Sequence, residues 1–231
     1  MDPLEELYPF LYGKGKNPER EKLALLESVR QKSAESVEVK TQFFAAHAEA
    51  LVRMAEALAA VYQQGGVLYT MGNGGSSCDA AHLVVEFMHP VTTGRPALAA
   101  HSLVSDQAMV TAVGNDIGFQ HVFLRQLTAL ARPGDALFGF STSGNSSNLM
   151  AAYRKAGEIG MVTFGLTGMQ GGVMRESGLV EHLLVVATDS IHRIQECHVT
   201  AFHILWDLVH TILADQRGNL RGEVTEHALR G

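Results

Sequence analysis

A histidine and a glutamate stand four residues apart in one stretch of the chain, and a second polar pair stands near its far end. His82 and Glu86 share one face of an expected helix, because residues four apart lie one helical turn apart. Gln195 and His203 lie eight residues apart on the last expected helix. Imidazole, carboxylate and amide oxygen together suit a borderline divalent metal such as zinc. Alternatively, Glu86 is a candidate general base and His203 a candidate general acid.

The same spacing has an ordinary structural explanation. A His-x3-Glu pair is common on helix surfaces and among hydrogen-bonded core groups, so the spacing alone does not establish a metal site. Most of the 11 histidines are expected to be structural or solvated, namely His47, His89, His101, His121, His182, His210 and His227. Cys78 is expected to be a small buried thiol and not a nucleophile.

Two loops rich in glycine, serine and asparagine each follow an expected strand and precede an expected helix. They are Gly72–Ser77 (GNGGSS) and Ser141–Ser146 (STSGNS). Ligands of parallel sheets bind beyond the carboxyl ends of strands, glycines allow close backbone approach, and helix N-termini favour anions. Neither loop is a Walker A or a GxGxxG motif, so a phosphorylated small molecule is favoured over a nucleotide. Two tight turns without a ligand are the structural alternative.

The order of apolar segments predicts an α/β fold. Five short apolar runs are expected to form buried strands, at 67–71, 97–103, 135–141, 161–167 and 182–188. Helices are expected at 77–88, 105–114, 120–131, 146–157, 172–176 and 191–214. This alternation predicts a mostly parallel five-stranded sheet flanked by helices, a flavodoxin-like three-layer sandwich.

Composition divides the chain into four regions. Residues 1–17 are expected to form an arm, and 18–64 a helical region of one long helix or two, starting at the Asn17-Pro18 signal. The α/β domain is expected at 65–214, followed by a polar tail at 215–231.

Composition also excludes several classes of protein. The chain has 231 residues, 46% of them hydrophobic, which is typical of one globular domain. A net charge of −6 argues against a general nucleic-acid surface. The two cysteines lack CxxC spacing, which argues against a disulfide scaffold. No uninterrupted apolar run has the length of a membrane span, and the N-terminus has no basic signal region, so a cytoplasmic protein is expected.

Taken together, the motifs resemble the sedoheptulose-7-phosphate isomerases (phosphoheptose isomerases), a family within the sugar isomerase (SIS) fold. The matching segments are GNGGSSCDAAH-xxx-E (Gly72–Glu86), GND (Gly114–Asp116), STSGNS (Ser141–Ser146) and RIQE-x-H-xxxx-H (Arg193–His203). The resemblance implies that 65–214 is a SIS sugar-phosphate isomerase domain. It also implies a homotetramer with active sites at subunit interfaces, one zinc ion per subunit, and a product that feeds heptose into lipopolysaccharide or other glycans.

The resemblance further implies a role for individual residues. Zinc would be held by His82, Glu86, Gln195 and His203, with Glu86 as general base and His203 as general acid. The sugar phosphate would be bound by Asn73, Gly74, Gly75, Ser76, Glu86, Asn115, Asp116, Ser141, Thr142, Ser143, Ser146 and Gln195.

Three features depart from the family pattern, and two alternative functions stay open. His192 stands where the family commonly has aspartate, and Pro90 where it often has arginine, the nearest being Arg95. The arm and the tail have no clear counterpart. One alternative is a non-catalytic SIS scaffold that binds a replication initiator, although that relative lacks the histidine at the position of His203. The other is an isomerase of a different phosphosugar.

Overall fold

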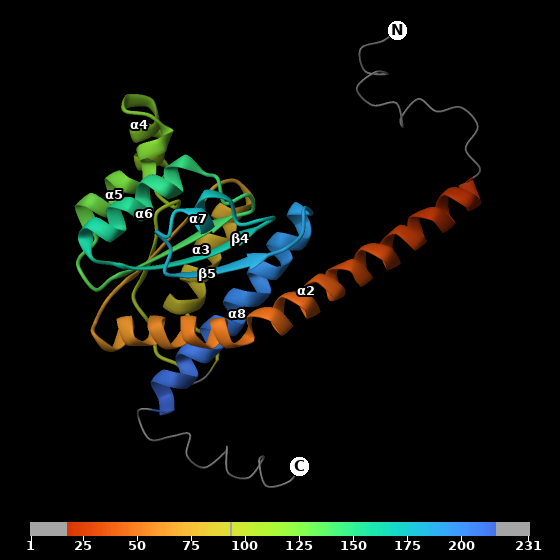
Figure 1. Ribbon diagram of the computed structural model, residues 1–231, viewed down its shortest axis with the longest axis horizontal. Coiled ribbons are helices and arrows are strands. Elements are labelled where there is room, and N and C mark those ends of the chain that lie inside the picture. The colour runs from red at the N-terminus through yellow and green to blue at the C-terminus, as the bar shows by residue number, and fades with distance from the viewer. Residues whose placement is uncertain (1–17, 93, 216–231) are drawn as a thin grey trace. The chain divides into compact units, whose positions relative to one another are not determined.

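The computed structural model of the protein describes residues 18–92 and 94–215 (Figure 1). Its helices are α2 (Pro18–Gln63), α3 (Gly75–Met88), α4 (Gln107–Asp116), α5 (Val122–Leu130), α6 (Ser147–Ile159), α7 (Gly172–Glu176) and α8 (Ile191–Asp215), with a 3-10 turn η2 (Phe119–His121). Its strands are β1 (Leu68–Gly72), β2 (Ala100–Ser102), β3 (Ala136–Ser141), β4 (Val162–Gly168) and β5 (His182–Val186). The expected arm, the Asn17 cap and the tail from residue 216 onward lie outside the described residues.

The five strands form one sheet in the order β2-β1-β3-β4-β5, and every neighbouring pair is parallel. This confirms the expected five-stranded α/β fold, with most strand ends within two residues of the prediction. Strand β2 is shorter than the expected 97–103. It lies at the sheet edge, pairs only with β1, and follows Pro96, which has no N–H to donate to a ladder.

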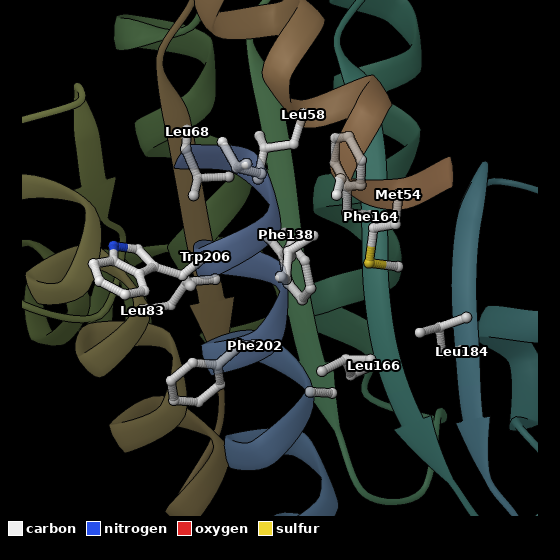
Figure 2. Packing of buried hydrophobic residues seen from close by; sticks show 14 of the residues in the cluster. Met54, Leu58, Leu68, Leu83, Phe138, Phe164, Leu166, Leu184, Phe202 and Trp206 are labelled. Carbon is white, nitrogen blue, oxygen red and sulfur yellow. The ribbon is translucent and has the colours of Figure 1, made fainter. Parts of the chain in front are cut away.

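Helices cover both faces of the sheet (Figure 1). On one face, Met54 and Leu58 of α2, Leu83 of α3 and Phe202 of α8 pack in one core with Phe138 of β3 (Figure 2). On the opposite face, side chains of α4, α5, α6 and α7 form a second core with the sheet. The packing of α3 beside α8 on the first face brings together the two helices that carry the candidate residues.

The N-terminal helical region is one helix, α2, where the sequence left open one or two. The chain nevertheless divides into two compact units, one ending at Glu38 and one beginning at Val39. In the first unit Leu23 and Val29 are exposed. In the second unit the side chains at i, i+3, i+4, i+7 and i+10 are buried as their spacing predicts, namely Leu51, Met54, Ala55, Leu58 and Val61.

Helix α8 is unusually apolar. Among the described residues it is the one helix that is long and apolar enough to span a membrane, with a mean hydropathy of 1.2 over the best window within Ile191–Ala214. Its side chains at Ile194, Phe202 and Leu205 are buried against the sheet. Packing in the core therefore accounts for part of the apolar composition of this helix, whose most apolar window is 39% buried.

A histidine is buried within this core. His198 of α8 has no exposed surface, and its ring lies 6.0 Å from that of Phe140. Burial lowers the pKa of His198 to about 4, and the backbone of Thr167 offsets part of this effect. The folded protein therefore keeps the His198 imidazole neutral at a pH where the unfolded chain would protonate it.

We expect His198 to make the protein less stable in acid. Because the pKa of His198 is lowered on folding, its contribution is fully present above pH 6.5 and is lost as the pH falls towards 4. The loss between pH 7 and pH 5 should be about 2 kcal/mol. Urea unfolding at both pH values should show a weaker decline for His198→Leu than for wild type. The matched control is His101→Leu, at an exposed histidine, and it should show the same decline in stability as wild type. Equal declines in all three proteins would refute this role of His198.

Candidate active site

Three of the four side chains with metal-ligand chemistry meet where α3 packs beside α8. The His82 Nε2 lies 3.0 Å from the Glu86 Oε1 on the same helix, as expected from their spacing. The His203 Nε2 reaches across from α8 to within 3.5 Å of the His82 Nε2 and 3.9 Å of the Glu86 Oε1. The ligand atoms of His82, Glu86 and His203 thus form a compact triangle, which we call the α3–α8 cluster.

Aromatic packing holds the two imidazoles of this cluster. The ring of His82 contacts the buried ring of Phe202 edge-on, with 5.1 Å between centroids, and the ring of His203 contacts Phe202 in the same way at 4.7 Å. Both histidine side chains are more than two-fifths exposed, whereas that of Glu86 is one-fifth exposed. The cluster is therefore fixed from the core side and open to a ligand from solvent.

The electrostatics of the cluster favour a neutral imidazole at His203. Burial lowers the pKa of His203, the neighbouring His82 lowers it further, and the Glu86 carboxylate raises it. The pKa of His203 is lower than its ordinary value as a result. A neutral imidazole can bind a metal or exchange a proton with an oxygen at neutral pH.

The three side chains also have the dimensions of a zinc site. In a tetrahedral zinc site with bonds of about 2.0 Å, ligand atoms lie about 3.3 Å apart. The separations of 3.0, 3.5 and 3.9 Å in the α3–α8 cluster are close to that value. Two imidazoles and one carboxylate are also a ligand set that zinc takes in proteins. The residues present therefore fit the metal.

Gln195, the fourth candidate ligand, lies against the first glycine-rich loop. A Cβ atom added at Gly75 would stand 2.2 Å from the Gln195 Nε2, so the amide rests directly on the backbone of the loop. Among the described contacts, none joins Gln195 to His82, Glu86 or His203. The structure thus brings three of the four candidate ligands into one cluster and places the fourth at the loop.

The two glycine-rich loops are neighbours in space. They follow β1 and β3, which pair directly, with Gly72 opposite Phe140. The first loop turns into α3 through hydrogen bonds from the Ser76 and Ser77 N–H groups to the carbonyls of Asn73 and Gly74. In the second loop the Ser141 Oγ accepts from the Gly144 N–H at 3.1 Å and lies 3.4 Å from the Ser146 Oγ. The Ser141 hydroxyl therefore helps to shape its own loop.

A reciprocal pair of amides joins these loops. The Asn73 Nδ2 donates to the Asn148 Oδ1 at 2.9 Å, and the Asn148 Nδ2 donates to the Asn73 Oδ1 at 2.8 Å. Asn148 is the second residue of α6, the helix after the second loop, and is almost completely buried. Sequence reasoning missed Asn148. Its place near the start of a helix after a candidate loop was the one local signal, and the contact with Asn73 spans 75 residues.

Replacing Asn148 by alanine should loosen the connection between the loops. Both amide hydrogen bonds would be lost and the Asn73 amide left without these partners, which should cost about 1–3 kcal/mol of unfolding free energy. We also expect KM for a sugar phosphate to rise about tenfold, since the loops would no longer be held in register. Urea unfolding and initial rates measure the two effects. Gln120→Ala, which removes an exposed amide, is the control; an unchanged KM in Asn148→Ala would exclude a role in the site.

Other sequence candidates lie elsewhere. Asn115 and Asp116 end α4, on the sheet face opposite α3 and α8; they are exposed and bonded to each other at 2.9 Å. No described contact joins them to the α3–α8 cluster.

Cys78 is exposed, so the expectation of a buried thiol was wrong. Helix α3 buries Asp79 and Ala80 on its inner side and leaves Cys78 on its outer side.

Several histidines outside the cluster have structural contacts. The His47 Nε2 lies 3.1 Å from the Val185 carbonyl oxygen, His182 stacks on Phe164, and His210 stacks on Phe87. His192, which departs from the family pattern, is exposed in the first turn of α8. None of these side chains contributes an atom to the α3–α8 cluster.

Comparisons with known proteins identify the family of this chain. A family model described as the SIS domain matches residues 33–168. The phosphoheptose isomerase of Desulfovibrio desulfuricans is 43% identical over 183 residues, which cover 79% of this chain and 86% of that protein. The one from Aquifex aeolicus is 36% identical over 192 residues, covering 83% and 100%. The structure of phosphoheptose isomerase from Neisseria gonorrhoeae is similar with a TM-score of 0.76 and 37% identity, covering 81% of this chain and 99% of that one. The chain therefore belongs to the phosphoheptose isomerase family of SIS domain proteins.

Proposed function

We propose that this protein interconverts D-sedoheptulose 7-phosphate and D-glycero-D-manno-heptose 7-phosphate. Membership of the phosphoheptose isomerase family supports an isomerase of this substrate class. The observation that carries the proposal is the meeting of α3 and α8, which sets the Glu86 carboxylate beside the imidazoles of His82 and His203. The cluster combines a carboxylate and a neutral imidazole, the two groups that a ketose–aldose isomerisation needs.

The reaction moves protons at two carbons and two oxygens. A proton leaves C1 of the ketose, a cis-enediol or enediolate forms, and a proton is delivered to C2 to give the aldose. The Glu86 carboxylate would move the carbon-bound proton, because a carboxylate close to the sugar carbons is a suitable general base. The His203 imidazole would carry the proton between the hydroxyl and carbonyl oxygens, and its lowered pKa keeps it ready to accept one.

We also propose that His82, Glu86 and His203 hold one zinc ion per subunit in the resting enzyme, with Gln195 as the fourth ligand. Because a lone pair bound to a metal cannot take up a proton, Glu86 and His203 would each move a proton only in a state in which that group has left the metal. Bound zinc would polarise the substrate carbonyl and stabilise negative charge on the substrate oxygens. The dimensions of the α3–α8 cluster support the first three ligands. For Gln195 the support is its amide, which lies beside the loop that begins α3.

The phosphate of the substrate would be held at the two glycine-rich loops. The N-terminal ends of α3 and α6 favour an anion, and the hydroxyls of Thr142 and Ser143 are partly accessible. Phosphate binding there would set how far the sugar carbons reach towards Glu86, and so orient the substrate. The resemblance to the family supports a cytoplasmic homotetramer with sites at subunit interfaces, and a product that serves the synthesis of surface heptose.

The substrate and the metal can be tested together. The purified full chain should convert sedoheptulose 7-phosphate, followed by NMR, at least 100-fold faster than fructose 6-phosphate or ribulose 5-phosphate. Treatment with a chelator should lower the rate by at least 100-fold, because metal ions contribute several kcal/mol to such reactions. Added zinc should restore the rate.

The other outcomes select between the alternatives. Faster conversion of a different phosphosugar would identify an isomerase of that sugar. No conversion of any phosphosugar would favour a non-catalytic scaffold. A rate unaffected by complete metal removal would refute the zinc site, and the metal content of the treated protein, measured by mass spectrometry, shows whether removal was complete.

A further inference from the structure

The end of α3 has an unusual arrangement of hydrogen-bond donors. The last carbonyls of a helix have no partner within the helix and need donors from elsewhere. The Val85 carbonyl accepts from the His89 N–H at 2.8 Å, and the Phe87 carbonyl accepts from the Leu98 N–H at 2.8 Å. The Glu86 carbonyl lies between them, and no backbone N–H of the described residues donates to it. Its donor is the indole Nε1 of Trp206, at 2.7 Å.

The sequence explains why a side chain has this task. In a continuing helix the donor to the Glu86 carbonyl would be the N–H of residue 90. That residue is Pro90, which has no N–H. Pro90 is also one of the positions at which this chain departs from the family pattern. The indole of Trp206 therefore supplies the hydrogen bond that Pro90 cannot make.

Trp206 is itself firmly held. Its side chain is mostly buried, and the Arg95 guanidinium lies over its ring at 4.3 Å from the centroid. Arg95 also pairs with Asp207, the residue after Trp206 on α8. On the other side, the ring of His210 contacts the indole edge-on at 5.1 Å. The indole thus has little freedom to turn away from the Glu86 carbonyl.

The position of Trp206 links this hydrogen bond to the cluster. Trp206 lies three residues after His203 on α8, and it binds the backbone of Glu86 on α3. We propose that Trp206 is a positioning residue: it fixes the last turn of α3, which carries Glu86, against the turn of α8 that carries His203. This inference rests on the proposed role of Glu86 in the reaction and in metal binding.

The test compares Trp206→Phe with a matched variant. Phenylalanine keeps an aromatic ring under Arg95 and removes the N–H donor together with part of the buried indole volume. Tyr153→Phe is the control, because the Tyr153 hydroxyl likewise donates to a backbone carbonyl, that of Phe164 at 2.7 Å, on the opposite face of the sheet. Both variants should have a lower melting temperature than wild type, and Trp206→Phe the lower of the two, because it also removes buried volume. Only Trp206→Phe should lower kcat for sedoheptulose 7-phosphate, by about tenfold, with KM within twofold of wild type.

A double variant tests the link to Pro90. In Trp206→Phe with Pro90→Ala, residue 90 regains an N–H that can donate to the Glu86 carbonyl, so kcat should recover towards wild type. The dissociation constant for Zn²⁺, measured by competition with a chelating dye, should follow the same order, rising about tenfold in Trp206→Phe and falling back in the double variant.

The outcomes separate this inference from the proposed function. A Trp206→Phe protein whose kcat and Zn²⁺ affinity stay within twofold of those of Tyr153→Phe overturns the positioning role. A double variant as slow as Trp206→Phe overturns the compensation for Pro90. If wild type shows no isomerase activity, the proposed function fails, while the Zn²⁺ affinities of the same variants still decide whether Trp206 positions the cluster.

Discussion

Replacing Glu86 by glutamine should lower kcat for sedoheptulose 7-phosphate by about 10²- to 10⁴-fold, since a positioned general base contributes about that much. Glutamine has nearly the same shape and can still be hydrogen-bonded, but its amide cannot take up a proton from carbon. It also lacks the negative charge that faces His82 and His203 in the α3–α8 cluster. Rates followed by NMR over hours would resolve a loss of this size.

The control for this variant is Glu176→Gln, an exposed glutamate at the end of α7. It should keep wild-type kcat and melting temperature. Glu86→Gln should fold normally, because the side chain is partly exposed and an amide replaces it without a change of volume. A Glu86→Gln protein with more than a tenth of wild-type kcat would show that another group moves the carbon-bound proton.

Replacing Gly75 by alanine should lower kcat/KM by about 100-fold. The added Cβ would stand 2.2 Å from the Gln195 Nε2, closer than real Cβ atoms approach, and 3.1 Å from its Cδ, which is also a tight contact. Either the Gln195 amide or the first turn of α3 must move. A displacement of about 1 Å in a catalytic arrangement commonly costs about two orders of magnitude in rate. Initial rates over a range of substrate concentrations measure this effect.

Gly157→Ala provides the contrast within the same protein. Gly157 lies in α6, and no atom stands within 4 Å of the position that its Cβ would take. Alanine there should raise the unfolding free energy by about 0.5–1 kcal/mol and leave kcat/KM unchanged. A Gly75→Ala protein with wild-type kcat/KM would mean that the Gln195 amide can move away without consequence, and Gln195 would then have no place in the site.

The sequence predicted the local parts of this protein well, because they depend on local patterns. Short apolar runs located every strand, and the spacing of four between His82 and Glu86 predicted their contact at 3.0 Å. The approach of His203 is different. It depends on the packing of α8 beside α3, which brings together two histidines that are 121 residues apart in the sequence. No local pattern predicts a contact over such a separation. Only the resemblance to a family indicated it.

The features that sequence reasoning missed are long-range contacts between ordinary residues. Asn148 resembled any polar residue at the start of a helix until its amide was seen paired with Asn73. Trp206 resembled any apolar residue of the last helix, and Pro90 resembled a loop proline. Their connection becomes visible only when the Glu86 carbonyl is followed to its donor. Cys78 was misplaced because free cysteines generally prefer the interior, although Cys78 lies one helical turn before the exposed His82.

The chain contains a single tryptophan, and that residue borders the cluster. All indole emission from the protein therefore originates one helical turn from His203. Quenching or a change in emission wavelength would report ligand entry at this place without any attached dye. The same property sets a limit on unfolding experiments, because fluorescence would follow the separation of α3 from α8, whereas circular dichroism would follow the helices of the entire chain.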